Sequence, residues 1–159
     1  MQNLSRKLVE IRFTEINATI GPGADKPRGG AVKVEVTLGV VDGPDNQALA
    51  TVEMNVKGIP KESSEDAFAF SVSIGCSALW EWTDKKPSLQ ELQTECMTHE
   101  LCSSVHTLAV SEVSRLTLSL GFPGVKIPWA ISEALQPDLQ KTASATKKPR
   151  LSRKPKQVK

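Results

Sequence analysis

Apolar and polar residues alternate along the first half of the chain in a pattern that predicts four β-strands. Over residues 9–13 the odd positions are apolar, and over residues 16–20 the even positions are, so the period of two slips once. This slip predicts one strand with a bulge near Thr14 and Glu15. Three more strands are predicted over residues 32–40, 48–56 and 68–74. Because the opposite positions are polar and the turns mostly short, we expect an antiparallel sheet with one solvated face.

A helical period then replaces the alternation and predicts one long helix over residues 101–121. Its main apolar stripe comprises Leu101, Val105, Leu108, Ala109, Val113, Leu116 and Leu120. A second side carries small or apolar residues, namely Val110, Ser114, Thr117 and Leu118. Between residues 103 and 120 only Glu112 and Arg115 are charged. We therefore expect the helix to be buried on both sides, with one face on the sheet and the other against a second subunit.

Local signals mark the end of this helix and predict two shorter ones. Gly121 can adopt a left-handed conformation after the last turn, and a proline two residues later blocks continuation. Ser88 and Glu91 have the spacing of a capping box, which predicts a short helix that runs toward Met97. A last helix is predicted from about residue 129 to 135. Strands followed by helices predict an α+β fold, with the helices on one face of the sheet.

The charges divide the 159-residue chain into an acidic body and a basic tail. From Lys141 onward there are eight Lys or Arg residues and no acidic residue, which leaves 12 basic and 18 acidic residues in the rest. We therefore expect one folded domain over residues 1–140 and a disordered tail over residues 141–159, which has almost nothing to bury.

The chain shows no sign of export or of membrane insertion. No apolar run follows Arg6 and Lys7, so we expect neither a signal peptide nor a membrane span. Three cysteines, an odd number, favour free thiols in a reducing compartment over a disulfide framework. We therefore expect a cytoplasmic location.

Candidate residues for catalysis or metal binding are few. Cys96, His99, Cys102 and His106 would lie on one side of a straight helix, but the first and last would be about 15 Å apart. Four such ligands cannot all reach one tetrahedral zinc ion, although Cys102 and His106 alone could share one. Nucleophile, Walker and dinucleotide-binding motifs are absent. We expect no enzyme activity, no metal and no cofactor.

Two features leave alternatives open. The basic tail could bind nucleic acid weakly, by neutralising phosphates, or could be a solvated segment that aids solubility. Trp80, Trp82 and Trp129 lie beside predicted turns in a chain without tyrosine. They are either core residues or the edge of an apolar groove.

Three short motifs follow one another near the end of the predicted folded domain: EVSRLTLSLGFP at residues 112–123, VKIP at residues 125–128 and SEAL at residues 132–135. Together they resemble the end of the SecB export chaperones. The sharpest motif of this resemblance is Gly121-Phe122-Pro123, and a weaker match in the order of elements extends it to roughly residues 8–136.

This resemblance implies a four-stranded antiparallel sheet with the helices on one face, assembled as a dimer of dimers with its helices between subunits. It also implies ATP-independent holding of non-native polypeptide in apolar grooves. Carried over by position, the groove would be lined by Phe68, Phe70, Leu79, Trp80, Trp82, Val125, Ile127 and Trp129.

The family docks the SecA motor through acidic residues on the outer face of the sheet, and this chain matches that feature only in part. Glu15 matches one such position, but Thr19 stands at the next, and the tail is basic rather than acidic. The client is therefore either an export precursor or one dedicated protein, such as the antitoxin of a toxin–antitoxin pair. The alternative function is a nucleic-acid-associated protein that acts through residues 141–159.

Overall fold

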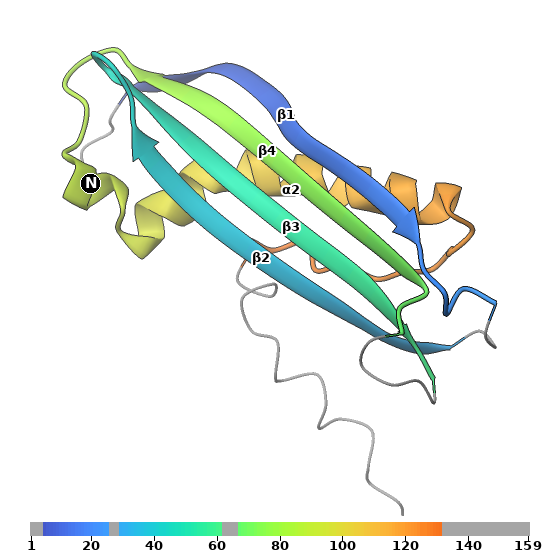
Figure 1. Ribbon diagram of the computed structural model, residues 1–159. Helices are drawn as coiled ribbons and strands as arrows, with labels where there is room; N and C mark the ends of the chain where they lie inside the picture. Colours follow the sequence, from blue (N-terminus) through green and yellow to red (C-terminus); the bar gives the residue numbers. More distant parts are fainter. Residues whose placement is uncertain (1–4, 26–28, 62–66, 132–159) are drawn as a thin grey trace, which may run out of the picture.

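The computed structural model describes residues 5–25, 29–61 and 67–131. It consists of a four-stranded antiparallel sheet with one long helix across one face (Figure 1). The strands are β1 (Arg6–Ile20), β2 (Gly30–Asp42), β3 (Gln47–Pro60) and β4 (Phe70–Trp82), and the helices are α1 (Leu89–Leu92) and α2 (Glu95–Ser119). This arrangement confirms the predicted α+β class.

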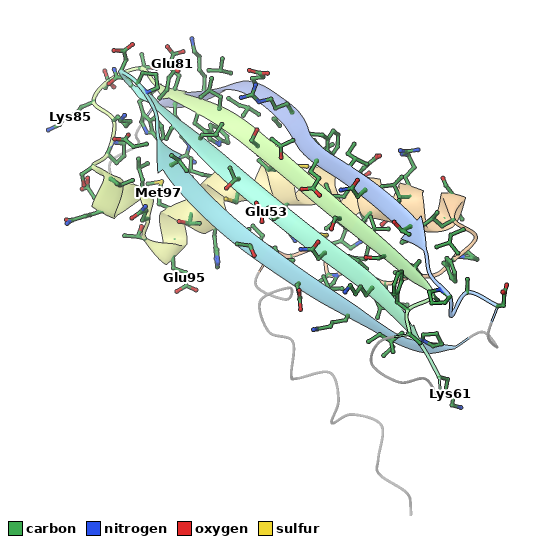
Figure 2. All side chains as sticks on the ribbon, viewed as in Figure 1. Glu53, Lys61, Glu81, Lys85, Glu95 and Met97 are labelled. Atoms are coloured by element: carbon green, nitrogen blue, oxygen red, sulfur yellow. The ribbon has the colours of Figure 1, made fainter. Side chains whose placement is uncertain are left out.

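The strand order is β1-β4-β3-β2, which makes β1 and β2 the two edges of the sheet. The chain therefore crosses the end of the sheet between β1 and β2, and then returns through two hairpins. Figure 2 shows Lys61 at this end of the sheet and Glu81 at the opposite end, with Glu53 on the outer face, away from α2. We call the two ends the Lys61 end and the Glu81 end.

The predicted bulge in β1 is confirmed. The pairing of β1 with β4 shifts register between Phe13 and Glu15, and it shifts a second time between Leu8 and Glu10. The second shift was not predicted, because the alternation of apolar residues at 9, 11 and 13 gives no sign of it.

The fourth strand differs from the prediction at both ends. It begins at Phe70 rather than at residue 68, and it continues past residue 74 as far as Trp82. The continuation has no clear period because Gly75, Cys76, Ser77 and Ala78 are all small and are all buried, whichever face they occupy. Leu79, Trp80 and Trp82 therefore lie on a strand and not in a connection.

The helices also differ in extent from the prediction. The capping box of Ser88 and Glu91 is present, but α1 ends at Leu92 instead of reaching Met97. The long helix then begins at Glu95, six residues before the predicted start. It ends as predicted: Gly121 has φ +87°, and the Phe122 amide donates to the Thr117 carbonyl. None of the helices in the described ranges is long and apolar enough to cross a membrane.

The core lies between α2 and the inner face of the two central strands. Its fully buried side chains include Val52, Met54, Val56, Val72, Ile74, Trp82, Leu101, Val105, Val110 and Val113. The helix packs mainly on β4 and β3 and less on β2. Most of the predicted last helix and the whole predicted tail fall within residues 132–159, outside the described residues.

Candidate functional site

After α2 the chain turns back over residues 122–131, which we call the strap; the strap makes a turn at Pro123 and Gly124 and has neither helix nor strand over residues 125–128. Gly121 and Gly124, at its start, both have φ above +80°, a backbone conformation that favours glycine. Ile127 and Ile131 are buried, whereas Trp129 is 61% exposed. The backbone of Trp129 contacts His106, far back along α2, so the strap runs along the helix beneath the sheet (Figure 1).

A cavity of about 740 Å³ lies at the Lys61 end of the sheet, where the strap begins. We call it the corner pocket. The crossing between β1 and β2, the ends of β3 and β4, and the end of α2 meet around it. Its large apolar side chains are Ile20, Val32, Ile59, Phe70, Leu120, Phe122 and Val125. Of the charged residues that the structure describes, Asp25 and Lys126 line it.

The aromatic wall of the corner pocket is held in place by a glycine. The rings of Phe70 and Phe122 have centroids 4.8 Å apart and are tilted by 41°. Gly58 is the cross-strand partner of Phe70, and a Cβ on Gly58 would lie 2.2 Å from Cε1 of the Phe70 ring. The ring therefore lies over bare backbone, which only glycine allows here.

A second glycine contact fixes the crossing above the pocket. The amides of Gly21 and Gly23 donate to the carbonyls of Ala69 and Phe68, each at 2.9 Å. A Cβ on Gly21 would lie 2.2 Å from the Phe68 carbonyl oxygen and 2.5 Å from its ring. The crossing thus lies directly against the segment that leads into β4.

The structure separates the eight residues predicted to line one groove. Phe70 and Val125 line the corner pocket, Phe68 packs behind it against Gly21, and Ile127 is buried in the strap. Trp129 is on the exposed side of the strap. Leu79 lies on the outer face of the sheet, as its pairing with Leu49 shows.

The two tryptophans of β4 are not part of the corner pocket. Trp82 is 2% exposed and belongs to the core, one of the two alternatives left open for it, so it does not line a groove within the protomer as the resemblance implied. Trp80 is half-buried, and its Nε1 donates to the Leu101 carbonyl at 3.1 Å while Arg6 lies over its ring at 5.3 Å. Both are ten or more residues from Phe70, roughly 35 Å along the strand.

Five large apolar residues that line the corner pocket were not predicted: Ile20, Val32, Ile59, Leu120 and Phe122. Phe122 could have been found, because it belongs to the Gly-Phe-Pro motif. The positions of Ile20 and Val32 depend on the strand order. They lie near Phe70 because β1 ends, and β2 and β4 begin, at the same end of the sheet.

An apolar row on β1 is left uncovered within the protomer. Pairing with β4 places it on the face that α2 occupies. Its members are Leu8 (39% exposed), Phe13 (37%), Ile16 (45%) and Ile20 (55%). We call these four residues the β1 row. Because α2 packs mainly on β4 and β3, it does not bury them.

The predicted second face of the long helix is not one continuous surface. Val110 and Thr117 are buried within the protomer, Ser114 is half-buried, and only Leu118 is largely exposed, at 63%. Val110 and Thr117 follow His106 by four and eleven residues, so they share the side of α2 along which the strap runs. The strap thus lies where a second subunit was expected.

The four residues considered as metal ligands do not come together. Cys96 is exposed, whereas Cys102 is buried with its Sγ 3.6 Å from the Thr51 carbonyl oxygen and 3.7 Å from that of Gly39. Burial raises the pKa of the Cys102 thiol to about 11. Within the described ranges, no group of three or more His, Cys, Asp or Glu residues could hold a metal ion.

The position suggested for motor docking is on the outer face of the sheet. Glu15 is exposed there and accepts a hydrogen bond from Nδ2 of Asn17 at 2.6 Å. Thr19 is exposed on the same face, paired with Ser71 of β4.

Comparison by sequence finds no matching family model and no matching curated protein. Comparison by structure does find matches. The SecB-like chaperone Rv1957 of Mycobacterium tuberculosis, solved in complex with a ChAD peptide from the HigA1 antitoxin Rv1956, matches with a TM-score of 0.61 at 16% identity. The match covers 77% of this chain and 89% of that one. A protein of unknown function from Streptococcus agalactiae matches with a TM-score of 0.49 at 10% identity, over 79% of this chain and 98% of that one. The first likeness shows that this chain has a SecB-like fold.

Proposed function

We propose that this protein is an ATP-independent cytoplasmic holdase that binds short apolar segments of non-native polypeptide in the corner pocket. One observation carries the proposal: a cavity of about 740 Å³ that the described residues line with seven large apolar side chains and two charged ones. Pockets that bind ligands commonly have volumes of about 300–1,000 Å³ and are mostly apolar. The fold shared with a chaperone that binds a peptide supports the same conclusion.

The lining of the pocket favours apolar contact over sequence-specific contact. Each large apolar side chain that a client buries there contributes about 1.5–3 kcal/mol. Three such side chains can hold a segment transiently without nucleotide or covalent chemistry. Asp25 and Lys126 lie among the lining residues and can orient the polar backbone of the client.

The client is either an export precursor or a dedicated partner such as an antitoxin. The antitoxin peptide bound by the Mycobacterium tuberculosis chaperone favours the second class. Docking of the SecA motor through Glu15 would be needed only for the first class, so the two are separable by experiment.

We further propose that the protein is a homotetramer, a dimer of dimers. Exposed large apolar side chains along the inner face of an edge strand support one interface, through the β1 row. Leu118, exposed on the side of α2 that the strap leaves open, supports a second interface. Two different self-complementary surfaces would produce a closed tetramer.

The holdase proposal is tested by one substitution in the pocket and a matched one outside it. Val32 lines the pocket and is 39% exposed, and Val41 of the same strand is 56% exposed but lies on the outer face of the sheet. Val32→Asp should lower the affinity for an apolar peptide at least tenfold and weaken suppression of client aggregation. Val41→Asp should leave both unchanged. Equal activity of the two variants would contradict the assignment of the pocket.

A further inference from the structure

A single histidine ring lies between α2 and the strap. His106 is 1% exposed, and the backbone of Trp129 makes a hydrogen-bonding contact with it. Its Nε2 is buried and has no hydrogen-bond partner in the described part of the chain. The ring thus contacts the strap, and its buried Nε2 finds no partner among the described residues.

The geometry of the strap agrees with this contact. From His106 to the end of α2 at Ser119 is 13 residues, or about 20 Å of helix. The chain turns at Pro123 and Gly124, and the stretch without turn or helix covers only residues 125–128. The strap therefore returns toward His106 after this turn, and the backbone of Trp129 contacts the ring close to the far end of the strap.

Within the described residues, the elements around His106 bring no charge that could stabilise a protonated ring. On α2, its neighbours one turn away are Cys102, a neutral thiol, and Val110. Beneath the helix, the inward positions of β2 from Val32 to Val40 and of β3 from Ala48 to Val56 are all apolar. On the strap the charged residue is Lys126, which is exposed.

The acidic groups of α2 nearest to His106 in sequence lie on other sides of the helix. Glu100 and Glu112 are each six residues away, which places each of them about 120° around α2 from His106. Glu100 pairs with Arg6, and Glu112 accepts a hydrogen bond from Nε of Arg115. Burial lowers the pKa of the His106 ring, and the hydrogen bond with the Trp129 backbone, which acts to raise this pKa, has the smaller effect.

We propose that neutral His106 holds the strap against α2, and that protonation of His106 detaches the strap and removes one wall of the corner pocket. The wall in question is formed by Phe122 and Val125, which belong to the strap and line the pocket. Gly121 and Gly124 flank Phe122 at positive φ and supply the points where the backbone can turn. This inference rests on the proposed function, because it assigns acid-triggered client release to the same site.

The sign of the pH dependence follows from the burial of the ring. In the detached state His106 is solvated and has an ordinary pKa of about 6.5. A pKa lowered in the docked state means that docking is fully stable above this value and weakens as pH falls below it. The ratio of docked to detached strap should fall by up to tenfold for each pH unit, until the pH drops below the pKa of the docked ring.

The test follows the isoleucine methyl groups of the full-length protein by NMR between pH 7.5 and 5.0. Ile127 and Ile131 report on the strap, and Ile74 reports on the core of the sheet. The strap methyls should titrate with a midpoint below about pH 6.5, together with the imidazole of His106, while the Ile74 signal stays constant. His106→Gln should abolish this titration. His99→Gln, which removes the only other histidine, should preserve it.

A second measurement links the strap to the pocket. The affinity for a fluorescein-labelled decapeptide of Leu, Val, Trp and Gly should fall at least threefold from pH 7.5 to 5.5 in the parent and in His99→Gln. In His106→Gln it should stay constant.

Three results would overturn the inference. The first is an absence of titration in the strap methyls, and the second is an equal titration of these methyls in His106→Gln. The third is a peptide affinity that stays constant over the pH range in which the strap methyls titrate. Loss of the Ile74 signal would show that His106→Gln has unfolded. In that case the parent protein decides: equal titration midpoints for the His106 imidazole and the strap methyls support the inference, and different midpoints contradict it. Absence of peptide binding at every pH would overturn the proposed function instead, while the methyl titration would still decide whether His106 holds the strap.

Discussion

Replacement of Gly58 by alanine is the sharpest perturbation of the corner pocket. The new Cβ would lie 2.2 Å from Cε1 of Phe70, so the ring must move by about 1.2 Å to reach ordinary contact at 3.4 Å. The ring can move only toward Phe122 and the pocket, since β3 lies behind it. Overpacking of this kind costs about 1–3 kcal/mol.

Two further contributions adjust this magnitude. Displacement of Phe70 weakens its contact with Phe122, and such aromatic pairs contribute about 0.5–1.5 kcal/mol. In the opposite direction, replacement of glycine by alanine restricts the unfolded chain and stabilises by about 0.4–1 kcal/mol. We expect the free energy of unfolding to fall by about 1–3 kcal/mol in total, and the affinity for an apolar peptide to fall with it.

Urea denaturation and peptide binding measure the two effects, with Gly39→Ala as the matched control. Gly39 also lies in a strand, but a Cβ there would meet only the Thr51 hydroxyl oxygen, at 2.8 Å, which can rotate away. Gly39→Ala should therefore change stability by less than about 0.5 kcal/mol. A Gly58→Ala protein as stable and as active as the control would refute the argument that bare backbone supports the aromatic wall.

Further predictions concern the core, a buried lysine, the assembly and the tail. Trp82→Ser should lower the free energy of unfolding by about 3–5 kcal/mol in chemical denaturation, because the ring is 2% exposed. Lys86→Met should cost about 1–2 kcal/mol in the same assay, since its ammonium bonds Asp42 at 2.6 Å and two backbone carbonyls. Phe13→Glu and Leu118→Glu should each leave dimers of twice 17.2 kDa in native mass spectrometry, and tetramers in both variants would contradict two separate interfaces. Removal of residues 141–159 should abolish any salt-sensitive binding of RNA and leave peptide affinity unchanged.

The sheet was predictable because each strand has one consistently buried face. Val52, Met54 and Val56 alternate with Thr51, Glu53 and Asn55, and this period of two reflects a face under the helix and a face in solvent. The prediction failed in β4 beyond residue 74, where small residues are buried on both faces and the period disappears. A pattern of burial can be detected only where polar residues mark the opposite face.

The second face of the long helix shows a different limit. Val110 and Thr117 are apolar or small because something covers them, and the sequence pattern indicates that correctly. It does not indicate what the cover is. A neighbouring subunit and a returning strap both require small or apolar side chains at these positions. Only the path of residues 122–131 therefore distinguishes the two.

The corner pocket could not be predicted from apolar positions, because its residues come from five separated segments that the order β1-β4-β3-β2 brings together. A usable signal was present in the glycines. In the sequence Gly21 and Gly58 look like ordinary loop glycines. In the structure each lies against a phenylalanine, and a Cβ at either position would be 2.2–2.6 Å from atoms of that residue. Glycine next to an aromatic ring across two strands indicates a place where a ring must lie on bare backbone. Because the Phe70 ring that lies over Gly58 forms one wall of the pocket, a search of a sheet for such glycine–aromatic pairs can locate this wall even where the other lining residues are not recognisable.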